Sequence, residues 1–184
     1  MQTIVEAYRD VPGDFARRSA HPPGEPRLLV YAFVAGLAGF VSGLPGTLAE
    51  ARAGIAETGE GEVSAYLIAA FFGAVFIFPL FLYGLAALVR VISRMFGGTG
   101  TGPGTRHAVF WGVLLALPLG ILGALAGPWL AGVHLWLLNG ILYLGFLWLL
   151  SGTVLVAENF RHRAKVIFAF LVPSLFFLAL AVLS

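Results

Sequence analysis

The chain alternates between long runs of uncharged, mostly apolar residues and short charged segments. The runs at 28–49 and 63–89 contain 22 and 27 residues without a charge. A helix needs about 20 apolar residues to cross the hydrocarbon core of a bilayer, so each run predicts one membrane-spanning helix, the second long enough to tilt. A signal peptide begins with a short basic head that its apolar core follows at once. Here 27 residues with both acidic and basic side chains precede Leu28, so we expect the first run to be a retained span.

A third run, 107–157, contains 51 residues without a charge if histidine is neutral, which is too long for one span. The pair Gly127-Pro128 lies inside it, and a proline there cannot continue the preceding helix. We therefore predict two spans, at about 107–126 and 130–156. A last apolar run predicts a fifth span at 166–184.

The predicted architecture is an all-α integral membrane protein, in which a partly amphipathic segment at 1–27 precedes a bundle of five transmembrane helices at 28–184. The composition supports it: 59% of the residues are hydrophobic and 11% are charged, whereas a soluble domain carries about 25% charged residues. The apolar runs are continuous, which argues against the short alternating strands of a membrane β-barrel.

Ten of the eleven basic residues lie in three segments, 1–27, 90–106 and 158–165. With five spans these segments share one side of the membrane, and the acidic loop at 50–62, with its single Arg52, falls on the other. Loops rich in Lys and Arg stay in the cytoplasm, so we predict a cytoplasmic N-terminus and an outside C-terminus. The high Gly, Ala and Arg content is typical of a GC-rich bacterial genome, so the expected location is a bacterial cytoplasmic (inner) membrane.

The N-terminal segment has apolar side chains at near-helical spacing over residues 2–20, with charged residues between them and Pro12-Gly13 as an interruption. This pattern favours a broken amphipathic helix on the cytoplasmic leaflet, with its arginines near lipid phosphates. A partly ordered tail is the alternative. The proline-rich stretch 21–26 predicts an extended linker into the first span.

The glycine-rich stretch 97–104 superficially resembles a phosphate-binding loop. It lacks the Gly-Lys-Ser/Thr sequence and the preceding strand that a Walker motif requires. We interpret it as a flexible cytoplasmic hinge between the second and third spans.

No pattern in the sequence predicts a catalytic, cofactor-binding or metal site. The chain has no cysteine, and it shows no nucleophile–base pair and no ligand cluster. His134 stands alone near the start of the fourth span, and a metal site needs several ligands. We therefore expect no enzyme activity and no cofactor.

Two rows of small residues repeat every four positions, and such rows allow the backbones of membrane helices to approach closely. An amide near the centre of the fourth span can add a hydrogen bond between helices. We expect these residues to make the main helix–helix or partner contacts. They are Ala35, Gly39 and Gly43 in the first span, Gly112, Ala116, Gly120 and Ala124 in the third, and Asn139 in the fourth.

Glu158 is the only acidic residue after Glu62, and it lies three residues before Arg161. A local ion pair is one interpretation, although an exposed pair at such spacing contributes only about 0.3–0.5 kcal/mol. The other interpretation is a cytoplasmic patch that docks a partner. Its candidate residues are Arg90, Arg94, Arg106, Glu158, Arg161, His162 and Arg163.

From about residue 26 the chain resembles the Yip (Ypt/Rab-interacting protein) domain family, most closely its small bacterial branch. The matching pieces are Pro26-Arg27-Leu28 and Phe40 to Pro45 at the two ends of the first span, Phe78-Pro79-Leu80-Phe81-Leu82-Tyr83-Gly84 in the second, and the Gly97-Gly98 loop leading into Arg106-His107-Ala108-Val109-Phe110-Trp111. The resemblance implies a non-enzymatic five-helix membrane protein that works by contact with lipids or other membrane proteins. Eukaryotic members contact lipidated small GTPases, but Tyr83-Gly84 lacks the flanking Asp and Pro of their tyrosine motif, so GTPase binding is not implied.

Two functions are compatible with this sequence. The leading hypothesis is a non-catalytic scaffold or accessory subunit of a larger membrane complex, with membrane lipids and another membrane protein as partners and no nucleic acid. The alternative is a small oligomeric transporter or channel, which predicts that Asn139 or His134 lines a wet cavity.

Overall fold

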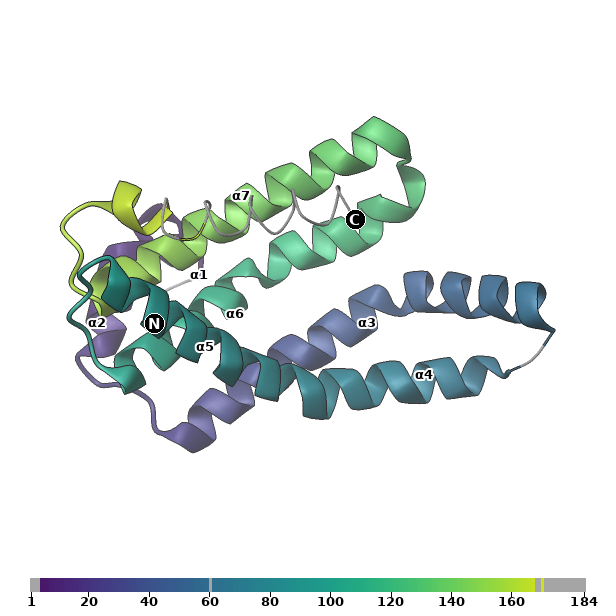
Figure 1. The fold of residues 1–184 in the computed structure, drawn as a ribbon, viewed down its shortest axis with the longest axis horizontal. Coiled ribbons are helices and arrows are strands. Elements are labelled where there is room, and N and C mark those ends of the chain that lie inside the picture. Colours follow the sequence, from purple (N-terminus) through teal and green to yellow (C-terminus); the bar gives the residue numbers. More distant parts are fainter. Residues whose placement is uncertain (1–3, 60, 168–169, 171–184) are drawn as a thin grey trace.

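The computed structural model describes residues 4–59, 61–167 and 170 of the 184-residue chain. All regular structure in these residues is helical (Figure 1). Two short helices, α1 (Ile4–Arg9) and α2 (Val11–Ser19), precede the long ones. The long helices are α3 (Glu25–Thr58), α4 (Val63–Phe72), α5 (Phe78–Met95), α6 (Gly102–Ala126) and α7 (Gly132–Ala157), with a π-helical turn η1 (Gly73–Ile77) between α4 and α5 and a 3-10 turn η2 (Gly127–Trp129) after α6.

Four helical stretches of the described chain are long and apolar enough to cross a membrane. They are Glu25–Glu57, Val63–Met95, Gly102–Trp129 and Gly132–Ala157, and they contain the first three predicted spans and all but the first two residues of the fourth. The predicted fifth span, 166–184, lies outside the described residues except at Val166, Ile167 and Phe170. The division of the third apolar run is confirmed, because α6 ends at Ala126 and η2 places Pro128 in its first turn.

Helix α3 extends beyond the predicted end of the first span at Ala49 and continues to Thr58. Its 34 residues are about 51 Å long, well beyond a hydrocarbon core of ~30 Å. Most of the expected acidic loop is therefore helix, because its Ala-rich turns pack on α4: a Cβ on Gly54 would lie 2.7 Å from the phenol oxygen of Tyr66. Gly59 then ends the helix in a left-handed conformation (φ +69°), and its N–H donates to the carbonyl of Ile55 at 2.9 Å.

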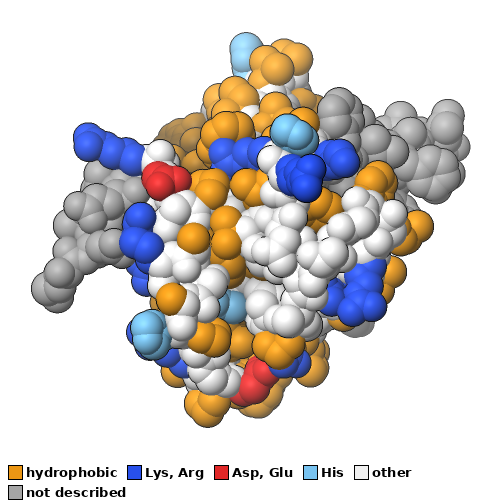
Figure 2. Space-filling view, turned by 90° about the vertical axis from the view of Figure 1, so that its left-hand side faces the viewer, with side chains coloured by type: hydrophobic (Ala, Val, Ile, Leu, Met, Phe, Trp, Pro, Cys, Tyr) orange, Lys and Arg blue, Asp and Glu red, His pale blue; other side chains and the backbone are white. Residues whose placement is uncertain are grey.

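The helices form two hairpins that meet at one end of the molecule. We call this end the basic end, and it holds α1, α2, the last turn of α5, the start of α6 and the residues after α7 (Figure 1). Lys and Arg side chains are spread across it, and acidic side chains are sparse (Figure 2). From there the α3–α4 hairpin and the α6–α7 hairpin diverge. The largest cluster of buried side chains lies at the basic end and consists of Phe15, Ala86, Val89, Ala108, Val109, Leu150, Val154 and Val166.

The N-terminal segment is a broken helix, as the sequence predicts, but the break falls at Asp10 rather than at Pro12-Gly13. The Asp10 carboxylate caps α2 by accepting from the backbone N–H of Gly13 at 2.9 Å, and Pro12 occupies the first turn. The apolar face packs on protein instead of on the membrane surface. Phe15 is fully buried, and the hydroxyl of Tyr8 donates to the carbonyl of Leu115 in α6 at 2.5 Å.

Candidate functional site: an apolar cavity between two helical hairpins

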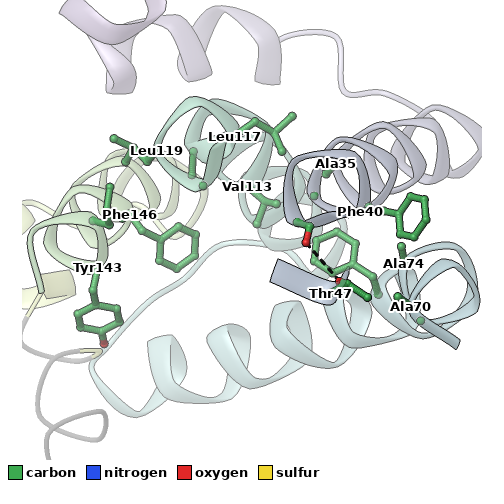
Figure 3. A pocket seen from close by; sticks show the side chains of 18 residues that line it. Ala35, Phe40, Thr47, Ala70, Ala74, Val113, Leu117, Leu119, Tyr143 and Phe146 are labelled. Atoms are coloured by element: carbon green, nitrogen blue, oxygen red, sulfur yellow. Dashed lines mark hydrogen bonds between the residues drawn. The ribbon is translucent and has the colours of Figure 1, made fainter. Parts of the chain in front are cut away.

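A cavity of about 620 Å³ lies between the two hairpins, and Figure 3 shows side chains of both pointing toward it. Among its lining residues only Thr47 and Tyr143 carry a polar side chain group. The hydroxyl of Thr47 donates to the carbonyl of Gly43 at 3.2 Å, so that group is engaged by its own helix. The cavity therefore suits an apolar group and offers little to a polar substrate.

Five of the predicted packing residues line this cavity from opposite sides. Ala35, Gly39 and Gly43 come from α3, and Ala116 and Gly120 come from α6. A Cβ atom built on any of the three glycines would meet no described atom within 4 Å. Among the described residues these glycines therefore contact no neighbouring helix, and the expectation that they contact a partner stays a prediction.

Two glycines outside the cavity-facing positions discussed above mark close helix–helix approaches: Gly112, which belongs to a predicted row, and Gly36, which does not. At Gly112, in the predicted row of the third span, α6 lies close to α7, since a Cβ there would lie 3.2 Å from the Thr153 hydroxyl oxygen. Gly36 was not predicted, yet a Cβ there would lie 2.3 Å from the backbone oxygen of Ala74 in η1. Gly36 is adjacent to the predicted row, and nothing in the sequence distinguishes the face of α3 that meets η1 from the face that lines the cavity.

The remaining predicted residues of the spans lie away from this cavity. Ala124 lines a smaller cavity of about 160 Å³ together with Gly39 and Gly120. Asn139 and His134 are both exposed on α7, and neither lines the large cavity. Asn139 therefore makes no hydrogen bond to another described helix, and its expected role in helix packing or partner contact stays a prediction.

The predicted docking residue Glu158 is buried, with no exposed surface, at the centre of the basic end. Its carboxylate accepts from Arg90 at 2.5 Å, from the backbone N–H of Gly100 at 3.1 Å and from the hydroxyl of Thr105. Glu158 thus pairs with Arg90, 68 residues away in sequence, and not with Arg161. Because its side chain is buried, it is not available to an exposed docking surface.

The glycine-rich stretch packs against the end of α7 and is not the flexible hinge that its composition suggests. The N–H of Thr99 donates to the carbonyl of Glu158 at 3.0 Å, next to the Gly100 contact with the carboxylate. A Cβ on Gly100 would lie 1.9 Å from the carbonyl oxygen of Ala157. Glycine is required here for close approach of two backbones rather than for flexibility.

Two further arginines of the predicted patch are also engaged within the chain. Arg106 pairs with Glu25 at 2.6 Å. The guanidinium of Arg163 stacks on the ring of Trp148 at 3.7 Å and donates to the Trp148 carbonyl at 3.1 Å. Burial lowers the pKa of Arg163 from its ordinary value, which the nearby charge of Asp10 partly offsets.

The other three residues of the predicted patch, Arg94, Arg161 and His162, are exposed. The seven candidates therefore do not form one exposed patch, because four of them have partners within the chain: Glu158, Arg90, Arg106 and Arg163.

The chain matches no protein-family model, and no curated protein or solved structure shows significant similarity to it. The resemblance to the Yip family is thus an expectation that these comparisons do not address.

Proposed function

We propose that this is a non-catalytic integral membrane protein that acts as a scaffold or accessory subunit, receiving a transmembrane helix of another membrane protein in the large apolar cavity. The observation that carries the proposal is the pair of small-residue rows on α3 and α6. They line the cavity from opposite sides, and at the three glycines no described atom lies within contact distance.

Physical reasons favour a helix as the occupant. Lipid tails are as apolar as leucine, so helices associate in a bilayer through close van der Waals packing rather than through a hydrophobic driving force. Rows of Gly and Ala permit that close packing, and here both walls of the cavity supply such a row. A lipid chain can also fill apolar space, but it does not need glycine on both sides.

We further propose five spans, a cytoplasmic N-terminus and an outside C-terminus, in a bacterial cytoplasmic membrane. The three segments that hold ten of the eleven basic residues gather at the basic end (Figure 1). Four spans return the chain to the side on which it started, and a fifth over 166–184 would carry the C-terminus across. The proposal therefore combines the positive-inside rule with the observed gathering of these segments.

A photo-crosslinking residue at Phe40, which lines the cavity, tests what occupies it in native membranes. The matched control places the same residue at Leu80, which is 69% exposed on α5 and does not line the cavity. The expected result is a discrete protein adduct from position 40 that is missing from position 80. Lipid adducts alone at position 40, or the same protein adducts at both positions, would refute the scaffold function.

Enlarging the cavity glycines provides a second test. Gly39→Leu and Gly120→Leu add apolar side chains at positions where a Cβ meets no described atom within 4 Å, so the fold should persist while co-purification of the partner is lost. Gly84→Leu is the control, since Gly84 is exposed on α5, also has no described atom within 4 Å of its Cβ position and does not line the cavity. Partner recovery that is equal in all three variants would count against the cavity as the binding site.

A further inference from the structure

A second cavity, at the basic end, has the opposite chemistry to the large one. It measures about 140 Å³, which is more than one water molecule requires. Its lining residues are Arg17, Arg18, His21, Pro23, Arg27, Tyr31 and His107. Three guanidinium groups, two imidazoles and a phenol thus converge from α2, the linker after it, α3 and α6, and no carboxylate lines the cavity.

One of the arginines is held in position before any ligand arrives. The Nε of Arg18 donates to Asp14 at 2.8 Å, and its guanidinium stacks on Trp111 with its carbon atom 3.9 Å from the ring centroid. Asp14 is itself 1% exposed and accepts from the indole N–H of Trp111 at 3.1 Å. These contacts fix Arg18 through Nε and leave its terminal nitrogens to donate elsewhere, which is the arrangement that favours bidentate binding of a phosphate.

The wall of the cavity contains a largely buried imidazole, that of His107. His107 is 3% exposed, and its ring packs against Phe15 with 4.8 Å between centroids. None of the hydrogen bonds between described residues involves its ring nitrogens, and the ring lines the cavity. A ligand oxygen in the cavity would provide a hydrogen-bond partner.

The positive charge of the cavity is only partly neutralised by the protein. Asp14 compensates Arg18, whereas the ion pairs of the described residues include neither Arg17 nor Arg27. Both of these arginines are exposed at the basic end. Two positive charges therefore face the cavity without an ion-pair partner among the described residues.

An apolar path leads from this cavity along α3 toward the middle of the span. Tyr31, Val34, Ala38 and Val41 follow Arg27 at helical spacing and so share its face. Val34 is 49% exposed and Val41 is 61% exposed, in a helix long and apolar enough to cross a bilayer. A molecule with its anionic group at Arg27 would have apolar protein surface beside its tail.

We propose that this cavity binds the phosphate group of an anionic phospholipid, with one acyl chain lying along the face of α3 that contains Val34 and Val41. The proposal deepens the proposed function and rests on its membrane placement, but it concerns a different cavity from the partner site. Arg17, Arg18 and Arg27 would donate to the phosphate oxygens, and His107 would add a hydrogen bond from the wall. A lipid is favoured over a soluble phosphate because the polar cavity continues into exposed apolar surface.

Native mass spectrometry of the full chain in neutral detergent tests the proposal, because neutral micelles remove the general attraction of an anionic leaflet. Phosphatidylglycerol and phosphatidylcholine are titrated separately, and inorganic phosphate is tested alone and as a competitor. The variant Arg17→Gln/Arg27→Gln removes the two uncompensated charges. The control Arg94→Gln/Arg161→Gln removes the same charge from exposed residues that do not line the cavity.

The expected result is one tightly bound phosphatidylglycerol. Its affinity should fall about 25-fold in the Arg17/Arg27 variant, at about five-fold per arginine, and less than about three-fold in the control. Equal losses in both variants, or no preference for phosphatidylglycerol over phosphatidylcholine, would overturn the proposal. Binding of inorganic phosphate as tight as that of the lipid would show a soluble-anion site instead. Gly39→Leu, which tests partner binding, should leave this lipid affinity unchanged, so failure of one proposal can be distinguished from failure of the other.

Discussion

Replacing Glu158 by alanine should destabilise the protein strongly, because this carboxylate joins three segments at the basic end. It accepts from Arg90 at the end of α5, from Gly100 in the glycine-rich stretch and from Thr105 in α6. The Arg90 side chain is 16% exposed and that of Glu158 is fully buried. The pair is therefore largely shielded from water, and screening by solvent does not reduce it to the small value of a surface ion pair.

The magnitude follows from what the substitution leaves behind. Truncating one partner of a buried ion pair costs about 3–5 kcal/mol, because the other charge stays buried without compensation. The two further donors would each cost about 1–3 kcal/mol if they stayed unsatisfied. Water entering the space left by the side chain can reach them, so we expect about 3–5 kcal/mol for Glu158→Ala in total. Glu158→Gln keeps the volume and an acceptor for Gly100 but loses the charge, and should cost about 1.5–3 kcal/mol.

Equilibrium unfolding in mixed detergent micelles, followed by far-ultraviolet circular dichroism, measures these free energies. Arg161→Ala is the control, because Arg161 is exposed and should change stability by less than about 0.5 kcal/mol. The double variant Arg90→Met/Glu158→Leu should recover much of the loss, since it removes both charges together. The reasoning fails if Glu158→Ala stays within about 1 kcal/mol of the wild type, or if Arg161→Ala is equally severe.

Three further predictions concern other parts of the molecule. Gly36→Ala should lower the free energy of unfolding by about 1–3 kcal/mol, because its Cβ would meet the Ala74 backbone at 2.3 Å. Gly39→Ala should leave that free energy unchanged or raise it by up to about 1 kcal/mol. Equal unfolding free energies for the two variants would contradict this reasoning. Gly152→Ala should displace Arg163 from Trp148, because a Cβ there would lie 2.3 Å from a guanidinium nitrogen, and a tryptophan fluorescence spectrum that the substitution leaves unchanged would contradict it. Reporter fusions should place the N-terminus in the cytoplasm and the C-terminus outside, and two termini in one compartment would refute the five-span topology.

The sequence alone determines the four long apolar helices of the described chain, although α3 continues beyond its predicted end. In a bilayer every backbone N–H and C=O must be satisfied inside the segment, so an uncharged apolar run of about 20 residues forms a helix regardless of its neighbours. The break at Gly127-Pro128 is equally local, because proline removes a donor and clashes with the preceding turn. The N-terminal segment shows the limit of local reasoning: its two helices follow the pattern, but the pattern does not reveal that their apolar face is covered by α6 and α7 rather than by lipid.

Only the tertiary structure decides which side chains meet. Glu158 is three residues from Arg161 in sequence but pairs with Arg90, because the ends of α5 and α7 come together and shield that pair from water. The small-residue rows were visible in the sequence, yet Gly112 packs against α7 while Gly39 and Gly120 line a cavity. A small side chain permits two helices to approach closely but does not bring them together. Whether they meet depends on the angle at which the two hairpins leave the basic end. That angle depends on contacts between residues far apart in the chain.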